Sequence, residues 1–145
     1  CLAVGTANGF RICNVSSYQE TFRRTFSNNC GGGIGCIEML FRCNLSALVG
    51  GGTVPQYPPN KVLLWDDHVG KPIGELSFRQ RVLAVRLRRD RICVALSDQV
   101  YVYNFVNLAL LDTIVTGGAK NGLGLLCIST DAGGSSSVGT VDDGG

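Results

Sequence analysis

Short apolar runs, separated by turn residues, follow one another along the whole chain. In no run do apolar residues recur every 3.6 positions over about 11 residues, so the pattern predicts strands, with helices at most a minor element. Asn8-Gly9 between the first two runs is a strong signal for a tight hairpin. The expected strands are residues 2–6, 10–15, 21–26, 37–43, 47–50, 61–67, 73–78, 82–88, 92–97, 100–105, 110–115 and 123–129.

These runs form a repeat. The polar residues Asn14, Asp66 and Asn104 each end an equivalent strand, and Asp66 and Asn104 are 38 residues apart. The first spacing is longer, at 52 residues, because the loops around 31–35 and 50–60 are extended. A period near 40 residues, four strands per repeat and Trp-Asp at a strand end are typical of a WD-type propeller blade.

The predicted fold is therefore all-β, a WD40-type β-propeller with about three blades of a seven-bladed ring. Residues 1–130 would form this incomplete propeller, with a first strand of the fourth blade, and the Gly/Ser/Asp-rich residues 131–145 a disordered tail. The chain opens in mid-strand at Cys1, which suggests an excerpt of a longer chain. We expect three four-stranded antiparallel blades in which the following side chains are buried: Trp65, Leu83, Val85 and Leu87.

Composition narrows the class of protein further. Hydrophobic residues make up 45% of the 145 residues, which excludes disorder over the whole length. The apolar runs are far shorter than the roughly 20 residues that span a bilayer. A net charge of +2 does not by itself indicate a nucleic-acid partner. Six arginines between Arg79 and Arg91 could bind anionic lipid headgroups or RNA, or could protect a blade edge by their charge.

The cysteines predict neither a metal site nor a catalytic thiol. There are seven, with no C-x-x-C pair and a single histidine, His68, so a structural zinc site is not expected. Most of the cysteines lie in apolar runs and should be reduced core thiols, although one or two disulfides are the alternative. Those in apolar runs are Cys13, Cys36, Cys43, Cys93 and Cys127.

Catalytic and nucleotide-binding motifs are also missing. No recognised nucleophile motif connects a serine or cysteine to His68, which lies in a polar turn. The glycine runs 31–35 and 50–52 are followed by strands and not by a helix, so they predict turns with positive φ rather than a phosphate cradle. We therefore expect no enzymatic activity, no cofactor, no small-molecule substrate and no nucleic-acid partner.

Between Cys36 and Asp67 the sequence resembles the PROPPIN family, WD-repeat propellers that bind phosphoinositides and are called WIPI proteins in animals. The resemblance rests on Ile37–Asn44, Ala47–Gly52, Tyr57–Val62 and Trp65–Asp67, with further matches at Phe10–Ile12, Val82–Leu87 and Gln99–Tyr103. It covers roughly residues 1–130. The triple glycine and Trp65-Asp66-Asp67 are most similar to the branch that holds the third and fourth human paralogues.

The resemblance implies a non-enzymatic phosphoinositide-binding scaffold in autophagy. Such a protein links membranes carrying phosphatidylinositol 3-phosphate or 3,5-bisphosphate to autophagy factors such as the Atg2-type lipid-transfer protein. It would be cytoplasmic and peripherally recruited to phagophore (preautophagosomal) and endolysosomal membranes. The family's lipid signature, Phe-Arg-Arg-Gly, belongs to later blades, so no lipid-binding residue is expected here. Phe22-Arg23-Arg24-Thr25 looks similar, but it comes too early and Thr25 replaces the glycine.

The resemblance also implies a partner-binding loop in the second blade, here residues 51–61. The candidate partner-binding residues are Pro55, Tyr57, Pro59 and Lys61. Proline stiffens the loop and Tyr57 offers an amphipathic anchor, so we expect the loop to project from the blade. A plain connector is the alternative at this site. For the whole protein the alternative is a generic WD-repeat interaction platform without lipid recognition.

Overall fold

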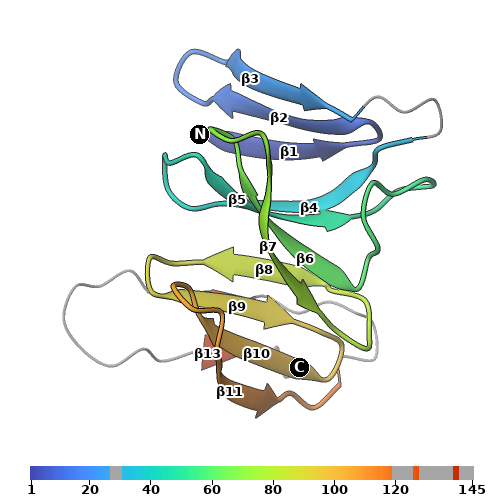
Figure 1. The fold of residues 1–145 in the computed structure, drawn as a ribbon, viewed down its shortest axis with the longest axis vertical. Coiled ribbons are helices and arrows are strands. Elements are labelled where there is room, and N and C mark those ends of the chain that lie inside the picture. Colours follow the sequence, from blue (N-terminus) through green and yellow to red (C-terminus); the bar gives the residue numbers. More distant parts are fainter. Residues whose placement is uncertain (27–30, 119–125, 128–138, 141–145) are drawn as a thin grey trace, which may run out of the picture. The chain divides into compact units, whose positions relative to one another are not determined.

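The computed structural model describes residues 1–26, 31–118, 126–127 and 139–140 (Figure 1). These residues are strands, turns and connecting segments, which confirms the all-β prediction, and none of them forms a helix able to cross a membrane. The chain divides into two compact units, Cys1–Val82 and Leu83–Gly145, which are described separately.

The first unit contains two antiparallel sheets. The first sheet has the order β1-β2-β3 and the second the order β4-β5-β6-β7, each running in sequence order. Their strands are β1 (Leu2–Thr6), β2 (Gly9–Asn14), β3 (Gln19–Thr25), β4 (Ile34–Met39), β5 (Leu45–Gly50), β6 (Lys61–Asp66) and β7 (Lys71–Ser77). Four strands per blade were expected, but the first sheet has three within the described residues.

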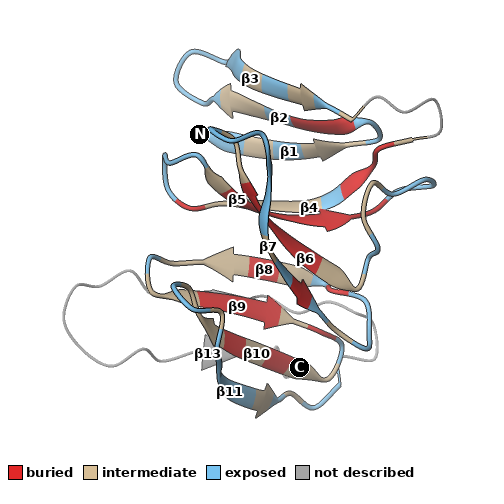
Figure 2. Cartoon of the chain, viewed as in Figure 1, coloured by how far each residue is buried: buried red, intermediate tan, exposed pale blue. Residues whose placement is uncertain are grey.

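The core of the first unit lies between its two sheets. Phe10 on β2 is 1% exposed, and its ring meets the ring of Trp65 on β6 edge-on at 6.3 Å between centroids. Ile34, Leu48 and Leu63 belong to the same buried cluster. Figure 2 shows that burial is concentrated on β5 and β6, whereas β3 and β7 are largely exposed. The first two sheets are therefore held together by an aromatic and aliphatic interface.

The second unit contains one four-stranded antiparallel sheet of order β11-β10-β9-β8. Cys93, Val100 and Val102 form a buried cluster on one face of it. A separate short pair joins β12 to β13. The strands are β8 (Ala84–Leu87), β9 (Arg91–Ala95), β10 (Gln99–Asn104), β11 (Leu110–Val115), β12 (Leu126–Cys127) and β13 (Gly139–Thr140). Apart from β13, the tail predicted to be disordered lies outside the described residues.

Two features recur at the same place in each of the three larger sheets. Each strand that ends on the expected polar residue is followed by a turn in which that side chain accepts a backbone N–H two residues later. The pairs are Asn14 with Ser16 (2.9 Å), Asp66 with His68 (2.8 Å) and Asn104 with Val106 (2.8 Å).

A β-bulge is the second recurring feature. The ladder shifts register between Ile12 and Cys13, between Leu64 and Trp65, and between Val102 and Tyr103. In each hairpin the bulge therefore comes one residue before the end of the inner strand. Equivalent turns and bulges confirm the phase of the repeat that the sequence predicts.

The predicted burial of Trp65 and of three residues in or next to β8 is only partly correct. Trp65 (5% exposed) and Val85 (0%) are buried as expected, but Leu83 is 40% exposed and Leu87 is half-buried. Leu83 precedes the first residue of β8, Ala84, so the alternation of a strand does not apply to it. A two-residue error in a strand boundary is enough to misplace such a side chain.

Candidate protein-interaction site

The predicted partner loop folds back onto the chain that enters the second sheet. The backbone oxygen of Val54 accepts hydrogen bonds from the N–H groups of Gly32 (3.2 Å) and Gly33 (3.0 Å). The oxygen of Gly33 in turn accepts from Gln56 (3.0 Å). The expectation that the loop projects is therefore wrong for this part, because its backbone groups are paired with the segment before β4.

Glycines permit this close approach. A Cβ atom on Gly50 would lie 1.6 Å from the backbone oxygen of Tyr57, and one on Gly33 would lie 2.1 Å from the oxygen of Gly51. Only Gly31, Gly32 and Gly52 among the two runs have positive φ, as predicted for turns. Gly33 and Gly50 are required for another reason: backbone atoms of the loop occupy the space that a Cβ atom would need.

Tyr57 anchors the loop to the core. Its ring packs edge-on against Phe26, with the centroids 6.0 Å apart, and it contacts the aromatic cluster around Phe10 and Trp65. Burial raises the pKa of the Tyr57 hydroxyl above its ordinary value. A half-buried ring in this position stabilises the loop and offers little surface to a partner.

The other three candidate residues differ in their surroundings. Pro55 and Pro59 are exposed. Lys61 begins β6, where its N–H donates to the oxygen of Pro58 (3.1 Å) and closes a turn with Pro59 at its second position. The Lys61 ammonium is paired with Glu75 at 2.5 Å, and this hydrogen bond lowers the pKa of the Glu75 carboxyl. The structure thus leaves two of the four candidates, Pro55 and Pro59, open to a partner.

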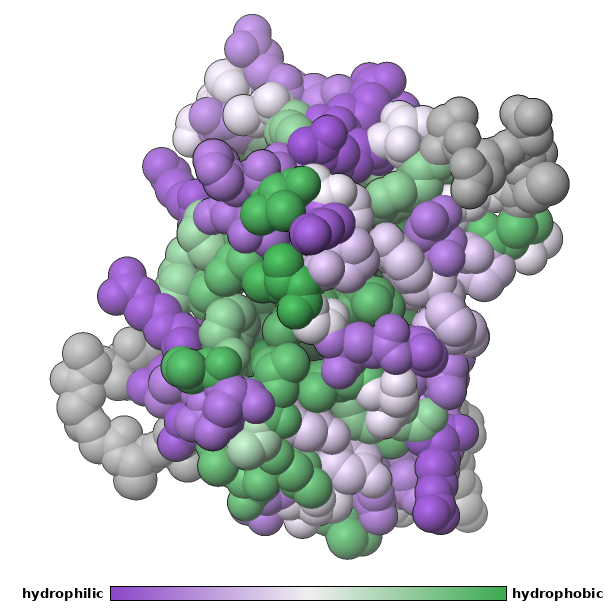
Figure 3. Space-filling view, viewed as in Figure 1, coloured by the Kyte–Doolittle hydropathy of each residue, from purple (hydrophilic) through white to green (hydrophobic). Residues whose placement is uncertain are grey.

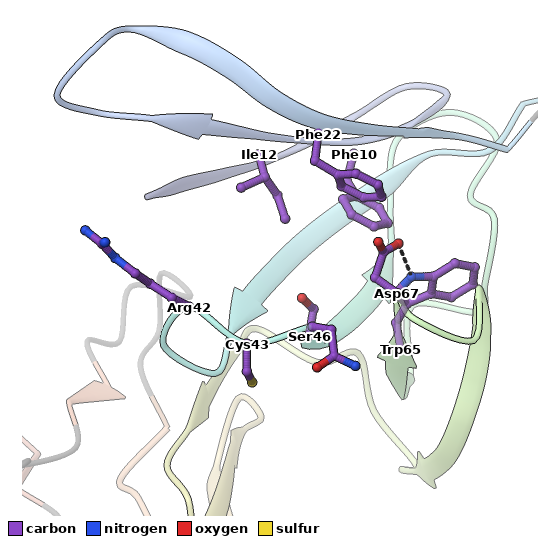
Figure 4. Close-up of a pocket in the computed structure, with 9 residues that line it drawn as sticks. Phe10, Ile12, Phe22, Arg42, Cys43, Ser46, Trp65 and Asp67 are labelled. Atoms are coloured by element: carbon purple, nitrogen blue, oxygen red, sulfur yellow. Dashed lines mark hydrogen bonds between the residues drawn. The ribbon is translucent and has the colours of Figure 1, made fainter.

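A hollow of about 260 Å³ separates the first and second sheets at the end where β4 turns into β5 (Figure 4). One wall is apolar, and the opposite rim carries a guanidinium, a thiol, an amide, a hydroxyl and a carboxylate. The lining residues are Phe10, Ile12, Phe22, Arg42, Cys43, Asn44, Ser46, Trp65 and Asp67. The Cys43 thiol donates to the backbone oxygen of Leu40 (2.9 Å) and not to a base, so it is not arranged as an activated nucleophile.

Asp67, which lines this hollow, connects the two sheets. Its Oδ1 accepts from Nε of Arg24 on β3 (2.9 Å) and from the indole nitrogen of Trp65 (3.3 Å), the bond drawn in Figure 4. The Arg24 guanidinium also lies over the ring of Phe22, 5.0 Å from its centroid. Arg23 is bound to Glu20 (2.7 Å). Both arginines of the Phe-Arg-Arg-Thr segment are therefore engaged by carboxylates of the protein.

The arginine cluster is divided between the two units. Arg79 and Arg81 belong to the first unit and the other four to the second. In the second unit, the Asp90 carboxylate forms ion pairs with Arg88 (3.0 Å) and Arg91 (3.5 Å). The positive charge of the second group is thus partly neutralised within the turn between β8 and β9.

Five cysteines of the described ranges form no disulfide bond, but not all of them are core residues. Cys93 is buried, which raises the pKa of its thiol, whereas Cys13 and Cys36 are half-buried and Cys43 is exposed. Cys43 lies in the turn after β4, which ends at Met39, four residues before the end that the sequence predicts. Cys127 lies on β12, whose side chains are outside the described part. No cluster of metal-binding side chains occurs in the described ranges.

The described sheets and the sequence can now be compared with known proteins. The PROPPIN family model matches residues 1–141. The chain belongs to the PROPPIN family. Autophagy-related protein 18e of Arabidopsis thaliana is 40% identical over 128 residues, which cover 87% of this chain and 33% of that protein. Autophagy-related protein 18 of Candida glabrata is 36% identical, over 90% of this chain and 25% of that protein.

Solved PROPPIN structures agree with the fold. Hsv2 of Kluyveromyces lactis superimposes with a TM-score of 0.68 at 26% identity, over 81% of this chain and 34% of that chain. KlAtg21, solved in complex with the coiled coil of AgAtg16, superimposes with a TM-score of 0.71 at 28% identity, over 90% and 40%. The sheets are thus blades of an incomplete β-propeller of the autophagy-related PROPPIN family. The chain spans about a quarter to a third of the length of the curated relatives described above.

Sequence reasoning missed the polar link between PROPPIN blades one and two. Arg24 and Asp67 are 43 positions apart, and no local pattern pairs them. Sequence reasoning also assigned the partner-facing charge of the loop to Lys61, which the structure pairs with Glu75. The Lys61–Glu75 pair could have been predicted from one signal in the sequence. The two residues are 14 positions apart on two strands, β6 and β7, that form a hairpin.

Proposed function

We propose that this chain is the N-terminal part of a non-enzymatic phosphoinositide-binding scaffold that acts in autophagy. The observation that carries the proposal is the PROPPIN match over residues 1–141, together with blades that superimpose on solved PROPPINs. The matched relatives are named autophagy-related proteins. In this proposal the full-length protein works in the cytoplasm and is recruited to phagophore and endolysosomal membranes.

The proposal assigns membrane binding and protein contacts to different blades. Membrane binding belongs to blades outside residues 1–145, which recognise phosphatidylinositol 3-phosphate and 3,5-bisphosphate. The present blades contribute protein contacts, including that to the Atg2-type lipid-transfer protein. KlAtg21 was solved in complex with a coiled coil of AgAtg16, which supports a role in protein partnering for a protein similar to this chain. The exposed prolines Pro55 and Pro59 of the second-blade loop are the proposed contact residues.

Liposome flotation tests the membrane part of the proposal. Full-length protein should float with vesicles that carry the 3-phosphorylated lipids and not with vesicles of unphosphorylated phosphatidylinositol. The chain 1–145 alone should show no such selectivity. A full-length protein that binds the partner but no phosphoinositide would instead indicate a generic WD-repeat interaction platform.

Pull-down of the Atg2-type protein tests the partner part. Pro55→Glu with Pro59→Glu in full-length protein should weaken retention of the partner while flotation is unchanged. Tyr57→Ala is unsuitable, because removing a ring of the core would disturb the fold as well. Lys71→Glu is the matched control: Lys71 is exposed and lies at the β6–β7 turn end of the second sheet. Retention that is equal in all three proteins would make the loop a plain connector.

A further inference from the structure

The segment that follows β7 lies across the end of the second-blade loop. The N–H of Phe78 donates to the oxygen of Asn60 (2.9 Å), and the Asn60 side chain donates back to the oxygen of Phe78 (2.9 Å). Four residues later, the N–H of Val82 donates to the oxygen of Pro59 (2.9 Å). Residues 79–81 are therefore held as a short arch beside Pro59 and Asn60, between two fixed backbone contacts.

This arch carries two arginines, Arg79 and Arg81. Both are exposed, and neither makes a hydrogen bond or ion pair within the described part of the chain. By contrast, Arg23 and Lys61 of the first unit are paired with the carboxylates of Glu20 and Glu75. Pro58 and Pro59 are exposed beside the arch. We call Pro58, Pro59, Arg79 and Arg81 the proline–arginine surface.

We propose that the proline–arginine surface docks an acidic segment of a partner protein, which rests on the proposed function of the second-blade loop. A guanidinium binds a carboxylate through two parallel hydrogen bonds, and these two have no carboxylate of the described chain to satisfy them. The proline rings add a rigid apolar contact. Because backbone hydrogen bonds already fix both segments, little backbone conformational entropy is lost on docking.

The number of charges on the proline–arginine surface, and the residues around them, favour a protein rather than a membrane as the binding partner. Recruitment to anionic lipid by charge alone typically takes a cluster of about four to eight basic residues. The surface offers two arginines, and the neighbouring Lys61 is neutralised by Glu75. Two exposed arginines beside exposed prolines instead suit a short acidic segment of a protein, which offers carboxylates to the guanidinium groups and apolar contact to the proline rings.

Charge reversal in full-length protein tests the proposal. The probes are overlapping fluorescein-labelled 20-residue peptides that cover the Atg2-type protein, with binding followed by fluorescence anisotropy. Acidic peptides should bind wild-type protein with an affinity that falls as salt rises. Arg79→Glu with Arg81→Glu should weaken that binding about tenfold or more and flatten the salt dependence. Lys71→Glu, an equal change of charge per residue, should leave the affinity within about twofold.

The outcomes separate the proposal from the function on which it rests. If Pro55→Glu with Pro59→Glu abolishes partner retention but the arginine reversal changes nothing, the loop binds a partner and the arginines do not. If neither variant matters, both the docking loop and the acidic partner are refuted. If the arginine reversal abolishes flotation with anionic vesicles but leaves peptide binding intact, the surface contacts lipid and the proposal is wrong. Circular dichroism spectra that match wild type confirm that the variants fold.

Discussion

Asp67 gathers several polar contacts around one carboxylate at the interface of the first two blades. Its Oδ1 accepts from Arg24 of the first blade and from Trp65 of the second, and its backbone oxygen lies 3.4 Å from the Arg24 guanidinium. Asp66, its neighbour, accepts instead from Asn44 and from the N–H of His68 within one blade. Of these two adjacent aspartates, Asp67 therefore connects two blades and Asp66 stabilises a turn within one blade.

Replacing Asp67 by asparagine should destabilise full-length protein by about 1 kcal/mol, because a charge-assisted hydrogen bond at a partly exposed site is lost. The urea midpoint followed by far-UV circular dichroism measures the change. Glu20→Gln, which breaks the more exposed pair with Arg23, serves as the control and should move the midpoint less. Equal shifts for the two variants would show that Asp67 does not connect the blades.

The lowered pKa of the Asp66 carboxyl predicts that the stability of the fold depends on pH in the acidic range. Burial tends to raise this pKa, but hydrogen bonds from Asn44 and from the backbone of His68 and Val69 outweigh it and lower the value. A carboxyl whose pKa is lower in the folded state stabilises the fold above its unfolded pKa, about 3.9, and loses that effect as the pH falls through the folded value. Asp66→Asn should therefore lower the urea midpoint at about pH 7, with a difference that shrinks near pH 3. A constant difference would contradict this.

At the scale of elements, the second-blade loop is a structural part of the interface between blades one and two. Its backbone pairs with Gly32 and Gly33, and its tyrosine packs on Phe26. Figure 3 shows hydrophilic and hydrophobic side chains interspersed on the face that it draws. The prolines at the loop end, Pro58 and Pro59, are exposed. A segment that looks like a long variable connector in the sequence is thus held in place by backbone hydrogen bonds and by the packing of its tyrosine.

Gly50→Ala should therefore destabilise the full-length protein strongly. The new Cβ would meet the backbone oxygen of Tyr57 at 1.6 Å, so the loop must leave its position, at a cost of about 2 kcal/mol or more. Gly117→Ala is the control, since nothing lies within 4 Å of a Cβ there and its φ is not positive. Urea midpoints of the two variants that differ by less than the error would refute the close packing at Gly50.

At the scale of the whole molecule, comparison of the repeats shows that β1 lies at a sheet edge, whereas its equivalents in the other two sheets are central strands. The recurring turns and bulges make β1 equivalent to β5 and β9, which are central, buried strands of their sheets. β1 instead lies at the edge of the first sheet, with Leu2 54% and Val4 40% exposed. An open strand edge with exposed apolar side chains is a site for pairing with another chain.

The isolated chain 1–145 should for this reason associate through β1. Light scattering coupled to size-exclusion chromatography should give a mass above the 15.4 kDa of one chain. Val4→Lys should shift the chain toward the monomer, because a charge on the edge opposes pairing. Val106→Lys, at a turn residue that is 87% exposed, should not. Association that is unaffected by Val4→Lys would place the contact elsewhere.

The sequence by itself determined the strands, their repeat and the family. Alternating apolar runs and the polar residues Asn14, Asp66 and Asn104 depend on contacts a few positions apart, which a single sequence displays directly. The same local information predicted the Asn8-Gly9 hairpin between β1 and β2. Local signals predicted strand ends less well, which explains the errors at Leu83 and Cys43.

Only the tertiary structure decided which groups of the candidate site are available. Tyr57 packs against Phe26, and Lys61 is paired with Glu75. Arg79 and Arg81 lie beside the loop because the flanking residues Phe78 and Val82 donate backbone hydrogen bonds to Asn60 and Pro59. These partners are between 14 and 31 positions apart in the sequence. These residues come into contact only through the pairing of strands and the packing of sheets. The energy of those contacts is summed over the whole interface, so no local pattern of residues encodes any single one of them.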